Sequence, residues 1–227
     1  MLRKYFLFSF LLLISFFAFT NDQKNSLIET YNKTYDRELV DIVIKDNIDI
    51  KGKVTSAGSL ALSDNIAEKN AFVVNKLIQA NYFIFGKANL SEWANFRSEN
   101  SVSGWSSFGG QTKHFLSDEY NPCGSSSGSA VAVAQGLVDI AIGTETNGSI
   151  SCPSSINGIV GMKPTTGLVS RSGIIPISSS QDTAGPMGKN VEIVAKTLEA
   201  ISGKDINDEA TLLIPDDFEF NFSSVVK

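Results

Sequence analysis

The sequence predicts an α/β fold, with a mixed, mostly parallel sheet flanked by helices. Apolar, β-branched runs alternate along the chain with segments of helical spacing, which is the pattern of layered α/β proteins. The 227 residues are 42% hydrophobic and include 18 glycines, so the chain can bury one sizeable core with many tight loops. The sequence contains no internal repeat and no low-complexity linker, and we therefore expect a single domain after the N-terminal segment.

Strands are expected where apolar and β-branched residues run together between polar or glycine-rich segments. Five such runs lie at 39–44, 82–86, 137–142, 159–163 and 168–170.

Helical spacing of apolar residues predicts two helices, at 66–80 and at 191–201, the second closed by Gly203. Ser91 is a candidate N-cap for a further helix in the stretch LSEWANF. The Ala/Val-rich stretch after Ser125 predicts a buried helix of small residues. The acidic, aromatic C-terminal stretch LLIPDDFEFNFSSVVK is expected to be weakly anchored.

The N-terminus has the pattern of a secretory signal peptide. Arg3 and Lys4 precede an apolar run at 5–19, and a small residue, Ala18, then precedes the polar stretch NDQKNS. We therefore predict a signal peptide at 1–20 and an exported chain, periplasmic or secreted, without stable membrane association after cleavage. The alternative is an uncleaved anchor, although the run is shorter than the ~20 residues of an ordinary membrane span.

Composition excludes several classes of function. The net charge of −5, without a basic stripe, argues against a nucleic-acid partner, because the phosphate backbone would be repelled. One histidine and two cysteines do not form a usual zinc set, and we expect no metal and no cofactor. A single histidine also leaves little material for a His-based serine triad.

A lysine and two serines are the strongest candidates for catalysis. Lys45 follows the apolar run LVDIVI, and a buried lysine readily loses its charge and becomes a base. Ser125 lies in PCGSSSGS, where the backbone can approach closely, and Ser149 lies in GTETNGSI after an apolar strand. The Asn147-Gly148 turn can aim successive N–H groups at one point, as an oxyanion site requires.

Each segment also has a plain structural interpretation. A lysine after a strand is most often a solvated strand end, and an Asn-Gly pair is often an ordinary turn. The stretch GSSSGS suits a flexible loop or a phosphate cradle, but the GK[ST] of a P-loop does not follow it. His114, in QTKHF, is expected to be a loop residue without a catalytic role.

At these residues the chain resembles the amidase signature family, whose hallmark is a Ser-Ser-Lys triad with one serine preceded by a cis peptide bond. The resemblance covers roughly 45–211 and extends through IKDNID, TSAGSLAL, FGKANLSEWANFR, SGWSSFGGQT, GIVGMKPTTGLVSRSGIIPIS and SQDTAGPM. It implies the amidase signature fold, with Ser149 as nucleophile, Ser125 as the bridging serine after a cis bond, and Lys45 as the base. It also implies an oxyanion hole formed by the main-chain N–H groups of Thr146, Asn147, Gly148 and Ser149.

The reaction that the resemblance implies is hydrolysis of a carboxamide to an acid and ammonia through an acyl-enzyme. Ser151 stands where many members have an arginine. Together with the stretches SEWANFR and SGWSSFGGQT, this makes the chain look closest to the peptide amidase branch, with a small amide or an amidated peptide as substrate. Family members continue well beyond the segment that this chain matches, so residues 21–227 correspond to a partial amidase domain and an incomplete fold. The alternative function is therefore a truncated, catalytically inactive amidase remnant.

Cys123 and Cys152 flank the two serine segments. If those segments converge as the resemblance implies, an oxidising compartment would permit a disulfide between them. The sequence shows no Cα separation, and two small buried thiols are the preferred interpretation.

Overall fold

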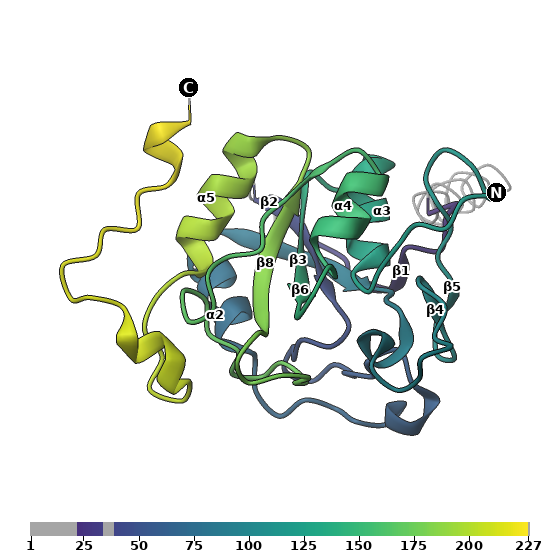
Figure 1. The fold of residues 1–227 in the computed structure, drawn as a ribbon, viewed down its shortest axis with the longest axis horizontal. Helices are drawn as coiled ribbons and strands as arrows, with labels where there is room; N and C mark the ends of the chain where they lie inside the picture. The colour runs from purple at the N-terminus through teal and green to yellow at the C-terminus, as the bar shows by residue number, and fades with distance from the viewer. Residues whose placement is uncertain (1–21, 34–38, 227) are drawn as a thin grey trace, which may run out of the picture.

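The computed structural model describes residues 22–33 and 39–226, and its core is a six-stranded mixed sheet (Figure 1). The predicted signal peptide at 1–20 lies outside these residues, so export and cleavage stay predictions. None of the helices in the described ranges is both long and apolar enough to cross a membrane.

The sheet has the strand order β1-β3-β2-β6-β8-β7. Its central strand β2 pairs in parallel with both β3 and β6, whereas the β1–β3, β6–β8 and β7–β8 pairings are antiparallel. The α/β class with a mixed sheet is thus confirmed, but the sheet is not mostly parallel, because three of its five strand pairings are antiparallel. The strands are β1 (Leu27–Thr30), β2 (Val40–Lys45), β3 (Tyr82–Ala88), β6 (Ile140–Glu145), β7 (Val160–Gly161) and β8 (Thr183–Gly188), with a separate hairpin of β4 (Trp105–Ser106) and β5 (Gly110–Gln111).

Helices cover both faces of the sheet. Side chains alternate along a strand, so Ile42 and Ile44 of β2 join the hydrophobic cluster under α2 and α5, while Val43 joins the cluster under α3. The structure therefore has three layers, with the sheet in the middle. The helices are α2 (Phe72–Gln79), α3 (Ser127–Ala134), α4 (Ser151–Ile156) and α5 (Val191–Ile201), with 3-10 turns at 60–62, 92–95, 209–213 and 223–225.

The small residues of α3 allow this helix to lie almost entirely inside the molecule. A Cβ added at Gly128 would stand 2.3 Å from the carbonyl oxygen of Ser26 and 2.4 Å from that of Asn89. Only glycine permits such a close approach between the helix and the chain beside it. The predicted buried, small-residue helix is confirmed, and it fixes the loop that carries Ser125 against the sheet.

Several predicted elements differ from the structure. The helix expected at 66–80 begins only at Phe72, because Ile66 pairs with Val54 in an isolated bridge. The strand expected at 168–170 is a single bridge between Val169 and Ser202. Ser91 caps no helix: its hydroxyl accepts from the Gly104 N–H, and a 3-10 turn follows it.

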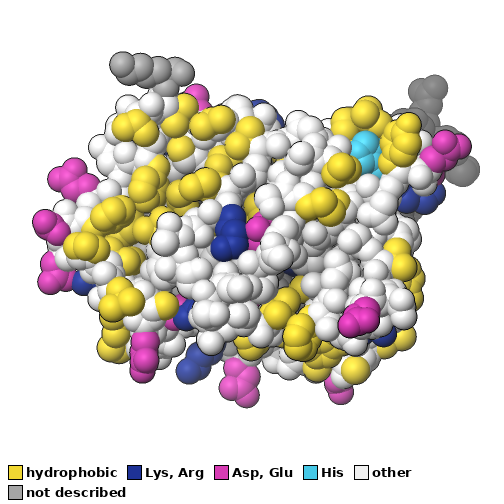
Figure 2. Space-filling model, viewed as in Figure 1, with side chains coloured by type: hydrophobic (Ala, Val, Ile, Leu, Met, Phe, Trp, Pro, Cys, Tyr) yellow, Lys and Arg dark blue, Asp and Glu magenta, His cyan; other side chains and the backbone are white. Residues whose placement is uncertain are grey.

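The C-terminal segment runs along the outside of α5 (Figure 1). It is attached through Phe222, which packs on the core, and through the Ser223 N–H, which donates to the Glu199 carboxylate. The expected weak anchoring is thus correct only in part. Hydrophobic side chains gather on the left of Figure 2 over α5 and this segment, where Leu213 and Phe218 are exposed.

Candidate active site

The candidate site lies where two parallel strands end side by side. β2 ends at Lys45 and β6 ends at Glu145, and the parallel pairing of Ile44 with Ile142 brings the ends of these strands to the same edge of the sheet. Polar loops follow both strands, so buried side chains at the strand ends can meet loop residues. This edge is where α/β sheets generally bind ligands.

Lys45 is fully buried among hydroxyl and carbonyl oxygens. Its Nζ lies 2.8 Å from Ser125 Oγ, 2.8 Å from Thr144 Oγ1 and 3.3 Å from the Thr144 carbonyl oxygen. Burial lowers the pKa of Lys45 from 10.5 to about 7, although the charges of Glu145 and Asp182 act in the opposite direction. The amine can therefore exist in its neutral form near neutral pH.

Ser125 is reached through a cis peptide bond from Gly124, as the family resemblance implies. The side chain is fully buried, and its main-chain oxygen accepts from the Ser91 N–H at 3.0 Å. The structure thus brings Ser125 and Lys45 into direct contact, although they are 80 positions apart in the sequence.

Ser149 contacts the loop that carries Ser125 through its main chain. Its carbonyl oxygen accepts from the Ser126 N–H at 3.1 Å, so the two serine loops touch. The Ser149 hydroxyl makes no hydrogen bond to any of the residues described, including Ser125. Ser149 as a whole residue is 9% exposed, and it is the most accessible of the three predicted catalytic residues.

Glu145 organises the loop that precedes and includes Ser149. Its buried carboxylate accepts from the N–H groups of Gly148 at 2.8 Å, Ile150 at 2.7 Å and Ser151 at 2.8 Å. Burial alone would raise the pKa of Glu145, but these donors lower the pKa overall. The Ser151 hydroxyl also donates to this carboxylate, so it is committed to the loop.

One of the four main-chain N–H groups predicted for the oxyanion hole already has an acceptor in the structure. The Gly148 N–H is taken by Glu145, because a buried carboxylate must be supplied with donors. The N–H groups of Thr146, Asn147 and Ser149 donate to no acceptor within the described ranges, so three of the four predicted amides remain available.

Four polar residues at the site were missed by the sequence analysis: Asn47, Thr144, Glu145 and Asp182. The strand expected to end at 142 continues to Glu145, and this boundary error hid Thr144 and Glu145 as strand-end residues. Asn47 follows the lysine, and its Nδ2 donates to Thr144 Oγ1 at 3.0 Å. Asp182 lies in the quoted stretch SQDTAGPM, where no residue pattern marks it.

A cavity of about 320 Å³ opens beside this cluster. It combines polar side chains from the strand ends with an apolar wall from the segment at 174–177. Such a mixture of an apolar lining and a few polar groups is typical of small-molecule sites. Its lining includes Asn47, Thr144, Thr146, Arg171, Ile177 and Asp182.

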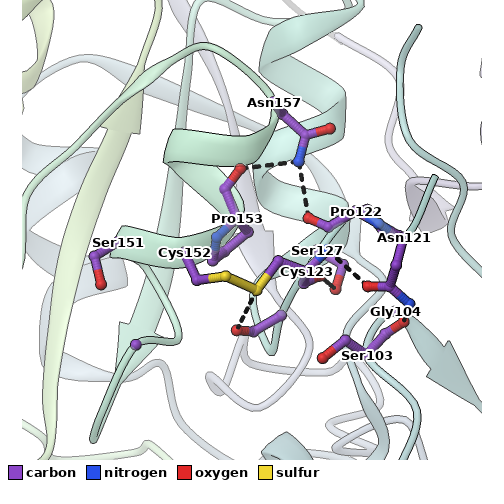
Figure 3. Close-up of a disulfide and its surroundings, with 12 residues drawn as sticks. Ser103, Gly104, Asn121, Pro122, Cys123, Ser127, Ser151, Cys152, Pro153 and Asn157 are labelled. Carbon is purple, nitrogen blue, oxygen red and sulfur yellow. Dashed lines mark hydrogen bonds between the residues drawn. A yellow bond between two sulfur atoms is a disulfide. The ribbon is translucent and has the colours of Figure 1, made fainter. Parts of the chain in front are cut away.

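The preferred interpretation of the cysteines as free thiols is wrong. Cys123 and Cys152 form a disulfide with a Cα separation of 6.0 Å (Figure 3). The sequence could not show this, because the pairing depends on the approach of two loops 29 positions apart. The bridge joins the segment just before Ser125 to the first turn of α4, just after Ser149.

The family model described as Amidase matches residues 38–227. A protein named "Probable amidase" from Arabidopsis thaliana is 47% identical over 173 residues, which cover 76% of this chain and 34% of that protein. A glutamyl-tRNA(Gln) amidotransferase subunit from Symbiobacterium thermophilum is 44% identical over 186 residues, covering 80% of this chain and 37% of that one.

Among solved structures, the native peptide amidase of Stenotrophomonas maltophilia aligns with a TM-score of 0.84 and 46% identity. The alignment covers 94% of this chain and 47% of that structure. The chain thus spans about half the length of the peptide amidase and about a third of the curated relatives that it matches.

Proposed function

The chain belongs to the amidase family, and from this premise we propose that it hydrolyses a carboxamide to a carboxylic acid and ammonia through Ser149, Ser125 and Lys45. The observation that carries the proposal is the buried amine of Lys45, 2.8 Å from the Ser125 hydroxyl. A neutral amine in that place is a base for a hydroxyl, and the chain then needs no imidazole.

Burial supports a neutral, proton-accepting state of Lys45, and the oxygens around its amine can accommodate that state. A neutral amine has two N–H donors and one lone pair. Thr144 offers two acceptors, its carbonyl oxygen and its Oγ1, which also accepts from Asn47. When the amine is neutral, its two donors can go to Thr144, and its lone pair can then accept the proton of Ser125 across the 2.8 Å contact.

In the proposed reaction, Lys45 accepts a proton from Ser125 while Ser125 accepts one from Ser149. The Ser149 oxygen then bonds to the substrate carbonyl carbon, and the proton returns through the same relay to the leaving nitrogen as the C–N bond breaks. Ammonia departs and leaves an acyl ester on Ser149. Water attacks this ester by the same relay, releasing the acid and restoring Ser149.

The unpaired N–H groups of Thr146, Asn147 and Ser149 are suited to the oxygen that becomes negative during attack. Fixed donors in a buried site stabilise such a charge, and loss of one donor typically costs about 100- to 1000-fold in rate. Each of these N–H groups lies within three residues of the nucleophile in the sequence.

We propose an amidated peptide as the substrate class. Support comes from the likeness to the peptide amidase of Stenotrophomonas maltophilia, which exceeds the likeness to a solved glutamyl-tRNA(Gln) amidotransferase subunit of Thermotoga maritima, with TM-scores of 0.84 and 0.75. Ser151, whose hydroxyl is bound to Glu145, provides no cation for a substrate carboxylate. An uncharged C-terminal amide is compatible with that arrangement.

Ammonia release from a C-terminally amidated peptide by the full chain tests the proposal. We expect release by the wild type and a loss on the order of 10⁶-fold in Ser149→Ala, because removal of a serine nucleophile has effects of that size. Ser155→Ala, an exposed serine on α4, is the matched control and should retain full activity. Equal turnover by Ser149→Ala would refute the proposed nucleophile, and an inactive wild type would favour the alternative of a silent remnant.

A further inference from the structure

Asp182 connects three segments at the edge of the candidate site. It lies just before β8, and its Oδ1 accepts from the Thr146 hydroxyl at 2.5 Å. Its Oδ2 accepts from the main-chain N–H groups of Ile177 at 2.7 Å and Ser178 at 2.8 Å. The carboxylate therefore holds the loop after β6 against the segment that lines the cavity.

Thr146 depends on this contact for its position. Glu145 holds the later part of the loop through Gly148, but the Thr146 main-chain N–H has no acceptor in the described part of the chain. The bond from the Thr146 hydroxyl to Asp182 is therefore the polar contact that fixes the first of the three unpaired amides. Without it, Thr146 and Asn147 would be held only by their neighbours in the chain, Glu145 in the sheet and Gly148 on the Glu145 carboxylate.

We propose that Asp182 is a positioning residue for the amide hydrolysis proposed above, because it anchors Thr146 and thereby aims the unpaired amides of the Thr146–Ser149 loop at the substrate carbonyl oxygen. The inference rests on the proposed function, but it concerns a residue outside the triad and the oxyanion donors. Asp182 touches none of the reacting atoms and acts through Thr146.

Asp182 also acts on Lys45 through its charge. Glu145 and Asp182 are the carboxylates whose charges raise the pKa of Lys45 against the effect of burial. Two further charged residues lie close by, Asp46 directly after β2 and Lys87 on β3, and they are paired with each other at 2.9 Å. Loss of the Asp182 charge should therefore lower the pKa of Lys45 further, so that the amine becomes neutral at lower pH.

Two variants distinguish the anchoring of Thr146 by Asp182 from the effect of the Asp182 charge on Lys45. Asp182→Asn removes the charge and weakens the anchor, whereas Thr146→Val removes the anchored hydroxyl and keeps the charge. We expect both to lower kcat about 10- to 100-fold, with KM changed less than about threefold, since a mispositioned oxyanion donor acts on the transition state. The acid limb of the pH–rate profile should move to lower pH in Asp182→Asn alone. Asp139→Asn, an exposed carboxylate paired with Lys189, is the control and should leave both measurements unchanged.

A second measurement decides the inference independently of turnover. In protein labelled with ¹³C-lysine and ¹⁵N, NMR should show a lower pKa of Lys45 in Asp182→Asn only. The amide shifts of Asn147 and Ser149 should change in both variants, and that of Thr146 should change in Asp182→Asn. Wild-type kcat in Asp182→Asn, or unmoved amide shifts at these three residues, would overturn the positioning role. If the wild type releases no ammonia, the proposed function fails, while the NMR result still shows whether Asp182 fixes the loop.

Discussion

Replacing Lys45 by methionine is expected to slow amide hydrolysis strongly and, at pH 7, to make the protein more resistant to unfolding. The general base would be lost, which typically costs about 10²- to 10⁴-fold in rate. The unbranched methionine side chain occupies nearly the same buried space without an amine that must be removed from water. Activity and stability should therefore change in opposite directions.

The pH dependence of this stability effect has a defined sign. In the unfolded chain Lys45 binds a proton below its ordinary pKa of 10.5, but in the folded protein only below about 7. Between these values the unfolded state holds more protons, so the free energy of unfolding of the wild type rises with pH. The lowering of the Lys45 pKa from 10.5 to about 7 destabilises the folded wild type by on the order of 5 kcal/mol. This full effect is present at and below pH 7. Unpaired hydroxyls of Ser125 and Thr144 would offset about 1–3 kcal/mol of the gain in Lys45→Met.

Urea unfolding at pH 7 and pH 9.5 measures the effect, and Lys87→Met is the matched control. Lys87 is also buried, but it pairs with the buried Asp46 at 2.9 Å. Removing one partner of such a pair typically destabilises by about 3–5 kcal/mol. The free energy of unfolding of Lys45→Met should exceed that of the wild type by more at pH 7 than at pH 9.5. Lys87→Met should be less stable than the wild type at both pH values. A Lys45→Met variant that is less stable than the wild type at pH 7 would contradict the assignment of a neutral, desolvated amine.

Breaking the disulfide between Cys123 and Cys152 is expected to destabilise the protein and to impair hydrolysis. For a sequence separation of 29, the loop-entropy relation gives a loss of about 3–4 kcal/mol in the free energy of unfolding. The bridge ties the segment before Ser125 to α4 after Ser149, so its loss should loosen the contact between the two serine loops. We expect Cys152→Ser to unfold at lower urea and to show reduced kcat.

Treatment of the wild type with dithiothreitol should reproduce both effects and be reversed by reoxidation. A Cys123→Ala/Cys152→Ala variant is the control and should not respond to the reductant. Thiol titration in urea without reductant should detect no free thiol in the oxidised wild type. Two titratable thiols, or an unfolding curve unaffected by the reductant, would show that the bridge does not contribute.

The centre of the fold could be predicted from the sequence, and its edges could not. The buried parallel strands β2 and β3 are apolar runs in the sequence, and their predicted positions match the structure closely. β8 (Thr183–Gly188) was missed because its sequence TAGPMG contains the residues of turns. The glycines of β8 are required by close packing, because a Cβ at Gly185 would stand 2.1 Å from the Met162 carbonyl oxygen.

The candidate site, too, could be predicted from the sequence only in part. The strand-end position of Lys45 follows from the pattern of residues, whereas the roles assigned to Ser125 and Ser149 came from the family resemblance. Thr144 and Asp182 could not be identified from the sequence, because their importance lies in contacts with residues 99 and 36 positions away, respectively. The disulfide was misjudged for the same reason: a distance between loops is a property of the fold.

The rate at which phenylmethylsulfonyl fluoride modifies the protein, followed by peptide mass spectrometry across pH 5 to 9, tests the central claim most directly. This reagent forms a sulfonyl ester with an activated serine and releases fluoride, so it reports on the lysine-driven relay without requiring turnover of an amide. We predict modification at Ser149, with a rate that rises through a midpoint near pH 7, and none in Lys45→Met. Modification of another serine instead, or a rate of Ser149 modification in Lys45→Met equal to that of the wild type, would contradict the account.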